Sequence, residues 1–268
     1  LTSVSMLAWG LGYFGMPHIL VRFMATGDPE KLKISRRVAT VWVVIAMGLA
    51  IIIGFVGLAM SKAGVIPALE GSSDAERVII HISNYMSSFG ILPAIIAGII
   101  LAGMLAATMS TADSQLLAAA SAISSDLLQD FGKKKFSDDV SVKIAKVTVV
   151  VISAISVLIA VDPNSSVFSI VSFAWAGFGA TFGPVMLLSL FWKRSNKWGA
   201  VAGMAVGGIM IFLWKFVISG LGGVFGIYEL LPAFVLALVV DVVVSLVTKA
   251  PEKEIETEYM AVQADMKN

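Results

Sequence analysis

The chain has 268 residues, of which 58% are hydrophobic and only 14% are charged. Soluble domains carry about 25% charged residues, so this composition excludes an ordinary water-soluble domain and indicates a polytopic membrane protein. The net charge of +1 gives no reason to expect nucleic-acid binding, and the lack of cysteine excludes disulfides and cysteine-ligated metals. The two histidines, His18 and His81, are too far apart in the sequence to suggest a zinc centre.

A helix needs roughly 20 apolar residues to cross a bilayer core. Seven stretches meet this requirement: residues 3–25, 38–60, 91–120 (continuing as helix towards 130), 142–161, 167–192, 199–218 and 227–248. The sequence therefore predicts an all-α membrane protein whose two ends lie on opposite sides of the membrane. Because it opens on Leu1 inside an apolar stretch, we expect it to be the C-terminal part of a longer protein.

The first span is interrupted in the stretch "LAWGLGYFGMPHIL". Three glycines and a proline cause the interruption: Gly10, Gly12, Gly15 and Pro17. Irregular backbone survives at membrane depth only when it is buried or lines a wet cavity, and secondary transporters build solute sites at such breaks. Trp9 and Tyr13 share a face of the preceding half-helix, where they can bracket a small solute. The alternative is a simple proline kink with interfacial aromatics.

The loop 61–90 contains apolar residues at helical spacing in "DAERVIIHISNYMSSF", after a possible cap at Asp74. This pattern predicts an amphipathic helix across the outer surface, either as a lid or as a plain interfacial helix. The charged end 249–268 lacks apolar residues for a core, and we expect it to be a mobile cytoplasmic tail.

The third span carries oxygen-bearing residues on one stripe, at i, i+3, i+4 and i+7: Ala107, Ser110, Thr111 and Ser114. Hydroxyl and carbonyl oxygens suit a small hard cation, and sodium fits better than a divalent ion, which usually requires several carboxylates. Asp113 lies beside the stripe, and an ionisable group within a span is a functional hypothesis by default. The alternative is that these small polar residues pack one helix against another. We expect Asp241, in the last span, to serve packing or a local polar contact.

Lysine and arginine are concentrated in alternate loops. One set of loops holds Lys31, Lys33, Arg36, Arg37, Lys133, Lys134, Lys135, Lys143, Lys193, Arg194, Lys197, Lys249 and Lys253. The positive-inside rule places this set in the cytoplasm, so the Leu1 end is predicted outside and the tail inside.

Three long motifs resemble the sodium/solute symporter family, in particular its sodium/proline branch: "AWGLGYFGMPHILVRFMA", "AGMLAATMSTADSQLLAAASAISSDLL" and "SFAWAGFGATFGPVMLLSLFWKR". The resemblance covers essentially the whole chain. It implies the second half of a five-plus-five inverted-repeat, leucine-transporter-like bundle in region 1–248. The second repeat would be residues 1–192, the peripheral helices 199–248 and the tail 249–268; the N-terminal half would be missing from this chain.

The resemblance also implies site residues. The carbonyl of Ala107 and the hydroxyls of Ser110 and Thr111 match sodium ligands, with further ligands from the missing half. Trp9, Tyr13 and Pro17 match positions that shape the solute site, and Ser114 matches a position near the solute. Asp113 and Ser114 stand where some relatives bind a second ion, although aspartate is unusual there. Met16 departs from the glutamine of familiar proline carriers.

The function implied is sodium-coupled import of L-proline, or a similar small amino acid, across the bacterial cytoplasmic membrane by alternating access. Within the same class, the solute could instead be pantothenate, a carboxylate or a sugar. A sensor module is disfavoured by the short tail after Val247. An enzyme is disfavoured because the spans hold no cluster of histidine or paired acids and the chain has no phosphate loop.

Overall fold

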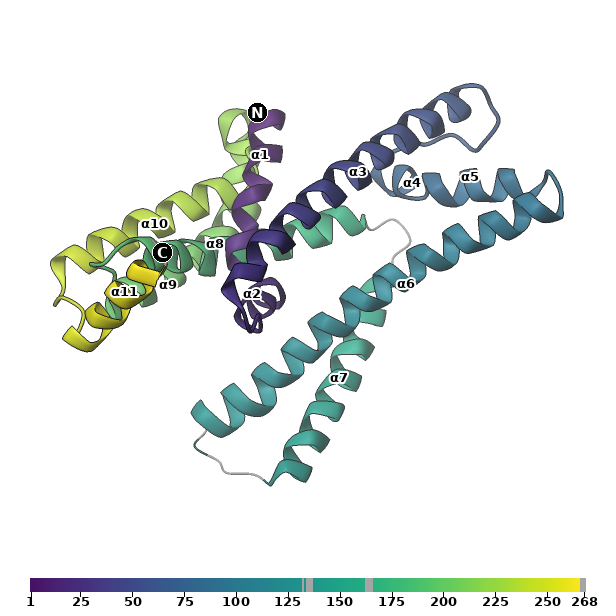
Figure 1. Cartoon of the computed structure of the whole chain (residues 1–268). Coiled ribbons are helices and arrows are strands. Elements are labelled where there is room, and N and C mark those ends of the chain that lie inside the picture. The colour runs from purple at the N-terminus through teal and green to yellow at the C-terminus, as the bar shows by residue number, and fades with distance from the viewer. Residues whose placement is uncertain (132, 134–136, 162–165, 266–268) are drawn as a thin grey trace. The chain divides into compact units, whose positions relative to one another are not determined.

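The computed structural model describes residues 1–131, 133, 137–161 and 166–265, and all regular structure within them is helical (Figure 1). The α-helices are α1 (Thr2–Gly12), α2 (Pro17–Met24), α3 (Pro29–Lys62), α4 (Ser72–Glu76), α5 (Val78–Ser87), α6 (Ile91–Ser121), α7 (Asp138–Ala160), α8 (Val167–Phe191), α9 (Lys197–Leu213), α10 (Leu230–Val247) and α11 (Lys253–Asp265). Short 3-10 or π-helical segments are η1 (Tyr13–Gly15), η2 (Ala122–Phe131), η3 (Trp214–Ile218), η4 (Ser219–Leu221) and η5 (Gly223–Gly226).

Six helices in the described part of the chain are long and apolar enough to cross a membrane, and the bent pair α1–α2 raises this number to seven. These helices coincide with the seven apolar stretches, which confirms the prediction of an all-helical, polytopic membrane protein. Helix α3 begins earlier than its apolar stretch. The cause is a polar cap, because the carboxylate of Asp28 accepts a hydrogen bond of 3.0 Å from the backbone N–H of Glu30.

The chain forms two compact units, Ala25–Ser169 and Leu1–Met24 with Ile170–Asn268. In the first of these, α6 contacts both α5 and α7, and α3 contacts α5. Only 6% of the most apolar window of α3 is buried within the described residues, and the same holds for α6 and α7. Helices that are apolar around most of their surface require lipid or further protein against them. The composition of this unit therefore requires a membrane or further protein segments.

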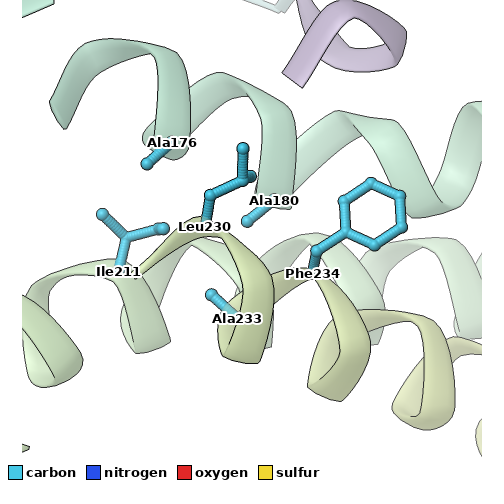
Figure 2. Close-up of a cluster of buried hydrophobic side chains, with 6 residues drawn as sticks. All are labelled: Ala176, Ala180, Ile211, Leu230, Ala233 and Phe234. Carbon is cyan, nitrogen blue, oxygen red and sulfur yellow. The ribbon is translucent and has the colours of Figure 1, made fainter. Parts of the chain in front are cut away.

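The other unit has a packed core between α8, α9 and α10 (Figure 2). Its buried side chains are Ala176, Ala180, Ile211, Leu230, Ala233 and Phe234. Small residues allow membrane helices to approach closely, and α9 presents glycines to its neighbours. A Cβ at Gly203 would lie 2.9 Å from the Cβ of Asp241, and one at Gly207 would overlap the backbone of Ala180. The close approach at Gly203 lets α9 pack against α10, and the one at Gly207 lets it pack against α8.

Asp241 is fully buried in this contact. Its Oδ1 accepts a hydrogen bond of 3.2 Å from the hydroxyl of Ser245, one helical turn away on α10. A Cβ at Gly199 would come within 2.5 Å of Asp241 Oδ1. The packing role expected for Asp241 is thereby confirmed.

The charged C-terminal end differs from the expected mobile tail, because residues Lys253–Asp265 form helix α11. Lys193 forms an ion pair of 3.3 Å with Glu256, and the amide of Gln263 donates a hydrogen bond of 3.1 Å to the carbonyl of Leu190. Lys193, which follows α8, therefore faces an acidic residue of the tail. Composition alone did not reveal this complementarity, since it depends on residues about 60 positions apart in sequence being brought together by the fold.

The outer loop forms two short helices, α4 and α5, instead of the single helix suggested by its apolar spacing. Asp74 lies inside α4 and does not cap α5, so that part of the prediction was wrong. The carboxylate of Glu76 instead caps the start of α8. It accepts hydrogen bonds from the hydroxyl of Ser166 (2.7 Å) and from the backbone N–H groups of Val167 and Phe168 (both 3.0 Å). The Ser166 bond, followed by those from the backbone, lowers the pKa of Glu76 below its ordinary value.

Candidate functional site

The first span is broken where α1 passes through η1 into α2, with a bend of 51°. Met16 lies between the two helical pieces in an extended conformation, with φ −83° and ψ 111°. The residue before a proline is pushed towards this region by contact with the proline ring. Pro17 is the first residue of α2, where the backbone N–H that it lacks would have had no helical partner. The proline therefore starts a second helix as well as ending the first.

Two of the three glycines in the break allow close contact between α1 and α8. A Cβ at Gly12 would overlap the indole of Trp175, and one at Gly15 would overlap the backbone of Phe178. On the α8 side, a Cβ at Gly179 would lie 2.6 Å from the Cα of Gly12. Nothing lies within 4 Å of a Cβ built at Gly10 in this structure. Gly12 and Gly15 thus allow the backbone of the first span to lie close to α8. From the sequence alone, this role could not be distinguished from the conformational freedom of glycine.

Trp9 and Tyr13 belong to an aromatic cluster that also contains Trp175 of α8 and Tyr228 before α10. The indole of Trp9 is nearly parallel to that of Trp175, with ring centroids 5.4 Å apart, and to the phenol of Tyr228 at 6.0 Å. Tyr13 contacts Trp175 edge-on, with centroids 4.8 Å apart. Trp9 is half-buried, whereas Tyr13 is 52% exposed. The two predicted solute-site aromatics are therefore brought together, and Tyr13 presents the more accessible surface.

Sequence reasoning did not single out Trp175 or Tyr228 as site residues. Their partners lie far away along the chain, and a single tryptophan in an apolar span is equally typical of a membrane-interface residue. A partial signal was present in "SFAWAGFGATFG", where glycine and alanine surround Trp175 and leave room for a neighbouring helix.

The predicted ion ligands lie on α6. The hydroxyl of Thr111 donates a hydrogen bond of 3.2 Å to the carbonyl oxygen of Ala107. Ser110 is adjacent in sequence, and its carbonyl accepts a bond of 2.9 Å from the hydroxyl of Ser114. Hard cations such as calcium lie about 2.3–2.6 Å from their oxygen ligands, so one small ion can contact both Ala107 O and Thr111 Oγ1 at this spacing.

These α6 residues are open within the described chain. Ala107, Ser110, Thr111 and Asp113 are exposed, and Ser114 is half-buried. Among the described residues no group of three or more acidic, histidine or cysteine side chains is placed to hold a metal ion. The available donors are thus neutral oxygens with one flanking carboxylate, a set that suits a monovalent ion better than a divalent one.

The predicted residues fall into two groups. Trp9, Tyr13 and Pro17 belong to the unit of Leu1–Met24 and Ile170–Asn268, and the α6 residues Ala107–Ser114 belong to Ala25–Ser169. The structure defines the geometry within each group.

The family described as "Sodium:solute symporter family" matches residues 1–207. The osmoregulated proline transporter OpuE of Bacillus subtilis is 42% identical over 94% of this chain and 49% of its own length. The sodium/proline symporters of Haemophilus influenzae and Escherichia coli are 41% and 38% identical, over 94% and 97% of this chain and 49% and 50% of their own lengths. The chain thus spans about half the length of these relatives. None of the solved structures matches it significantly. The chain belongs to the sodium:solute symporter family.

Proposed function

We propose that this chain is the C-terminal half of a sodium-coupled symporter that imports L-proline, or a similar small amino acid, across the cytoplasmic membrane. The observation that carries the proposal is the identity of 38–42% to relatives named as proline transporters or sodium/proline symporters, over nearly the whole chain. Since the chain spans half of their length, transport requires residues from outside it.

The sodium ion binds to the carbonyl of Ala107 and the hydroxyls of Ser110 and Thr111. The separation of 3.2 Å between Ala107 O and Thr111 Oγ1 supports this assignment, because one ion can replace the hydrogen bond that now joins them. Their exposure on α6 leaves room for ligands from the other half of the transporter. Asp113 and Ser114 are candidates for a second ion.

The solute binds beside the broken first span, against Trp9, Tyr13 and Pro17. Ser114 is a further candidate solute contact on the family resemblance alone. The bend of 51° interrupts the helix at Met16, and interrupted helices of this kind supply backbone groups that bind the polar groups of a solute. Gly12 and Gly15 support the break by letting it lie against α8, and Gly10 leaves an open surface next to Trp9.

The membrane orientation follows from the distribution of basic residues. We place the Leu1 end outside and the tail 249–268 in the cytoplasm. Residues 1–192 form the second repeat of the transporter, and the helices of 199–248 are peripheral. Seven crossings, with α1 and α2 counted as one bent span, agree with this arrangement.

Coupling to one sodium ion is energetically sufficient. Moving one positive charge inward is worth about 2.3 kcal/mol per 100 mV. At about 1.4 kcal/mol for each tenfold ratio, this energy concentrates a zwitterion roughly fiftyfold before any sodium gradient is added. Neither ATP hydrolysis nor covalent chemistry is required.

The solute is tested by measuring binding of radiolabelled proline to the purified full-length protein, with and without sodium. Unlabelled pantothenate, acetate and glucose are the competitors. We expect sodium-dependent binding that unlabelled proline displaces and the other three solutes do not. Displacement by one of those three at a lower concentration than proline would assign the protein to the other substrate class.

A further inference from the structure

Three regions of the chain converge on Trp9: α1, which carries it, α8, and the segment that leads into α10. Trp9 lies in the last turn of α1, seven residues before Met16, where the span is broken. Its carbonyl oxygen accepts a hydrogen bond of 2.9 Å from the indole Nε1–H of Trp175. The side chain of Trp175 on α8 is thus bonded directly to the backbone of the last turn of α1.

The same indole also covers the Trp9 ring. The two rings are inclined by only 14°, with centroids 5.4 Å apart. Such offset-stacked pairs stabilise by about 0.5–1.5 kcal/mol beyond the area that they bury. The bond to the carbonyl fixes the backbone of Trp9, and the stacking fixes its side chain, so one residue of α8 controls both.

Tyr228 holds the other side of the arrangement together. Its backbone N–H donates to the hydroxyl of Ser5 on α1 (3.0 Å), and its own hydroxyl donates to the carbonyl of Ser172 on α8 (2.6 Å). Its ring lies nearly parallel to that of Trp9, with centroids 6.0 Å apart. Tyr228 thus contacts α1 and α8 simultaneously, at the residue where the chain enters α10.

The contacts between α8 and α1 are closely packed. A Cβ at Gly12 would overlap the Trp175 indole, and Gly179 of α8 approaches the backbone of Gly12 closely enough to exclude a Cβ there. Protein interiors packed this closely transmit displacement instead of absorbing it. We therefore expect a substitution of Trp175 to displace the end of α1.

We propose that Trp175 and Tyr228 are positioning residues for the solute site, which hold Trp9 and the broken end of α1 in the geometry that binds the solute. This inference rests on the proposed function, because it takes Trp9 as a solute contact. Its consequence is that the segment leading into α10, a peripheral helix in the repeat scheme, supports the site through Tyr228. The same residues would set how tightly the solute is held without touching it.

The test uses the full-length protein in membrane vesicles and radiolabelled proline as the probe. In Trp175→Phe the aromatic ring remains but the bond to the Trp9 carbonyl is lost. We expect the KM for proline to rise about fivefold, the factor that corresponds to one neutral hydrogen bond of about 1 kcal/mol, with a much smaller change in the maximal rate. Trp214→Phe is the matched control, because the Trp214 indole also donates to backbone carbonyls, those of Phe225 and Ile227, but does not contact α1 through this bond. Its KM should stay within about twofold of the parent.

A double-mutant cycle separates positioning from a general loss of packing. If Trp175 acts through Trp9, the Trp175→Phe change should raise KM less in a Trp9→Ala background than in the parent, because the indole that it positions is then absent while the carbonyl of residue 9 remains. An equal rise in KM in both backgrounds, or no rise in either, overturns the inference. If Trp175→Phe does not reach the membrane, Tyr228→Phe decides: it keeps the ring and removes only the bond to Ser172, and an unchanged KM overturns the proposal. Failure of the proposed solute site is recognised separately, because Trp9→Ala would then leave the KM unchanged by itself.

Discussion

The hydroxyl of Thr111 donates to the carbonyl oxygen of Ala107, one helical turn earlier on α6, across 3.2 Å. Two oxygens are thereby held next to each other on an exposed surface of a helix that is otherwise apolar. A hydroxyl bonded to its own helix backbone adds little to the stability of that helix. Thr108 makes the same kind of bond to Met104, so the bond alone does not mark a ligand site, and the proposed site is tested by comparing the two threonines.

The ion assignment predicts that Ser110→Ala and Thr111→Ala each raise the sodium concentration needed for half-maximal uptake. Loss of an oxygen that contacts a charge is worth about 1.5–3 kcal/mol, so an increase of about tenfold or more is expected. Thr108→Ala is the matched control, since its hydroxyl makes the same bond of 3.0 Å to the backbone of Met104 but lies off the stripe. Sodium activation curves in vesicles provide the measurement. If both variants kept the parental sodium dependence, the assignment of Ser110 and Thr111 would be wrong.

The solute assignment predicts that Trp9→Ala weakens proline binding by about tenfold or more. The substitution removes the aromatic surface against which the solute packs, together with the stacking of Trp9 on Trp175. Trp9→Phe should be intermediate, since it keeps one ring. The quantity to measure is the dissociation constant of proline in the purified full-length protein, with the amount in the membrane as a control for folding. A normal affinity in Trp9→Ala would remove this residue from the site.

Gly10 and Gly12 are predicted to respond oppositely to the same substitution. Gly12→Ala forces the methyl group into the Trp175 indole and should cost about 1–3 kcal/mol, as other overpacking changes do. Gly10→Ala places its methyl group in open space of this structure and should be neutral or stabilising, by up to about 1 kcal/mol, because alanine favours a helix. Thermal unfolding midpoints in detergent distinguish the two. Equal destabilisation by both substitutions would contradict the packing role given to Gly12.

The cap formed by Glu76 is predicted to depend on pH. Because its hydrogen bonds lower the pKa of Glu76 below the ordinary value of 4.5, the carboxylate stabilises the folded junction at neutral pH. This stabilisation is fully present above pH 4.5 and is lost as the pH falls through the lower folded value. Glu76→Gln should therefore speed amide exchange at Val167 and Phe168 at neutral pH.

The ratio of exchange rates between Glu76→Gln and the parent provides the control, because the intrinsic chemistry of exchange cancels in it. We expect this ratio to fall towards one in acid, where the parent carboxyl is also protonated. A ratio of one at neutral pH, or one that stays constant into acid, would show that the charge of Glu76 does not stabilise the start of α8.

The sequence was sufficient to predict the long helices, because length and apolar composition alone determine which segments can cross a bilayer. The break before Pro17 was also predictable from the sequence, since proline restricts the residue that precedes it. Contacts between residues far apart in the sequence were not predictable in this way. Trp175 and Tyr228 meet α1 only because α8 and the segment before α10 fold back onto it, and helix α11 contacts Leu190 and Lys193 at the end of α8.

Asp74 illustrates a second limit of the pattern. Its spacing from the apolar run suits a helix cap, but Arg77 separates two short helices and leaves Asp74 within the first. The hydrogen-bonding carboxylate of the loop is instead Glu76, whose partners are some 90 residues later in the chain. Local spacing predicts which side chains can cap a helix, but not which helix the fold brings to them.

The central claim is that sodium binding drives solute accumulation, and it is tested most directly by proline uptake into vesicles that contain the full-length protein. An inward sodium gradient should cause transient accumulation above equilibrium, and a matched potassium gradient should not. Thr111→Ala should shift this accumulation to higher sodium, while Thr108→Ala should not. Equal accumulation of proline under both gradients, without any sodium requirement, would contradict the account.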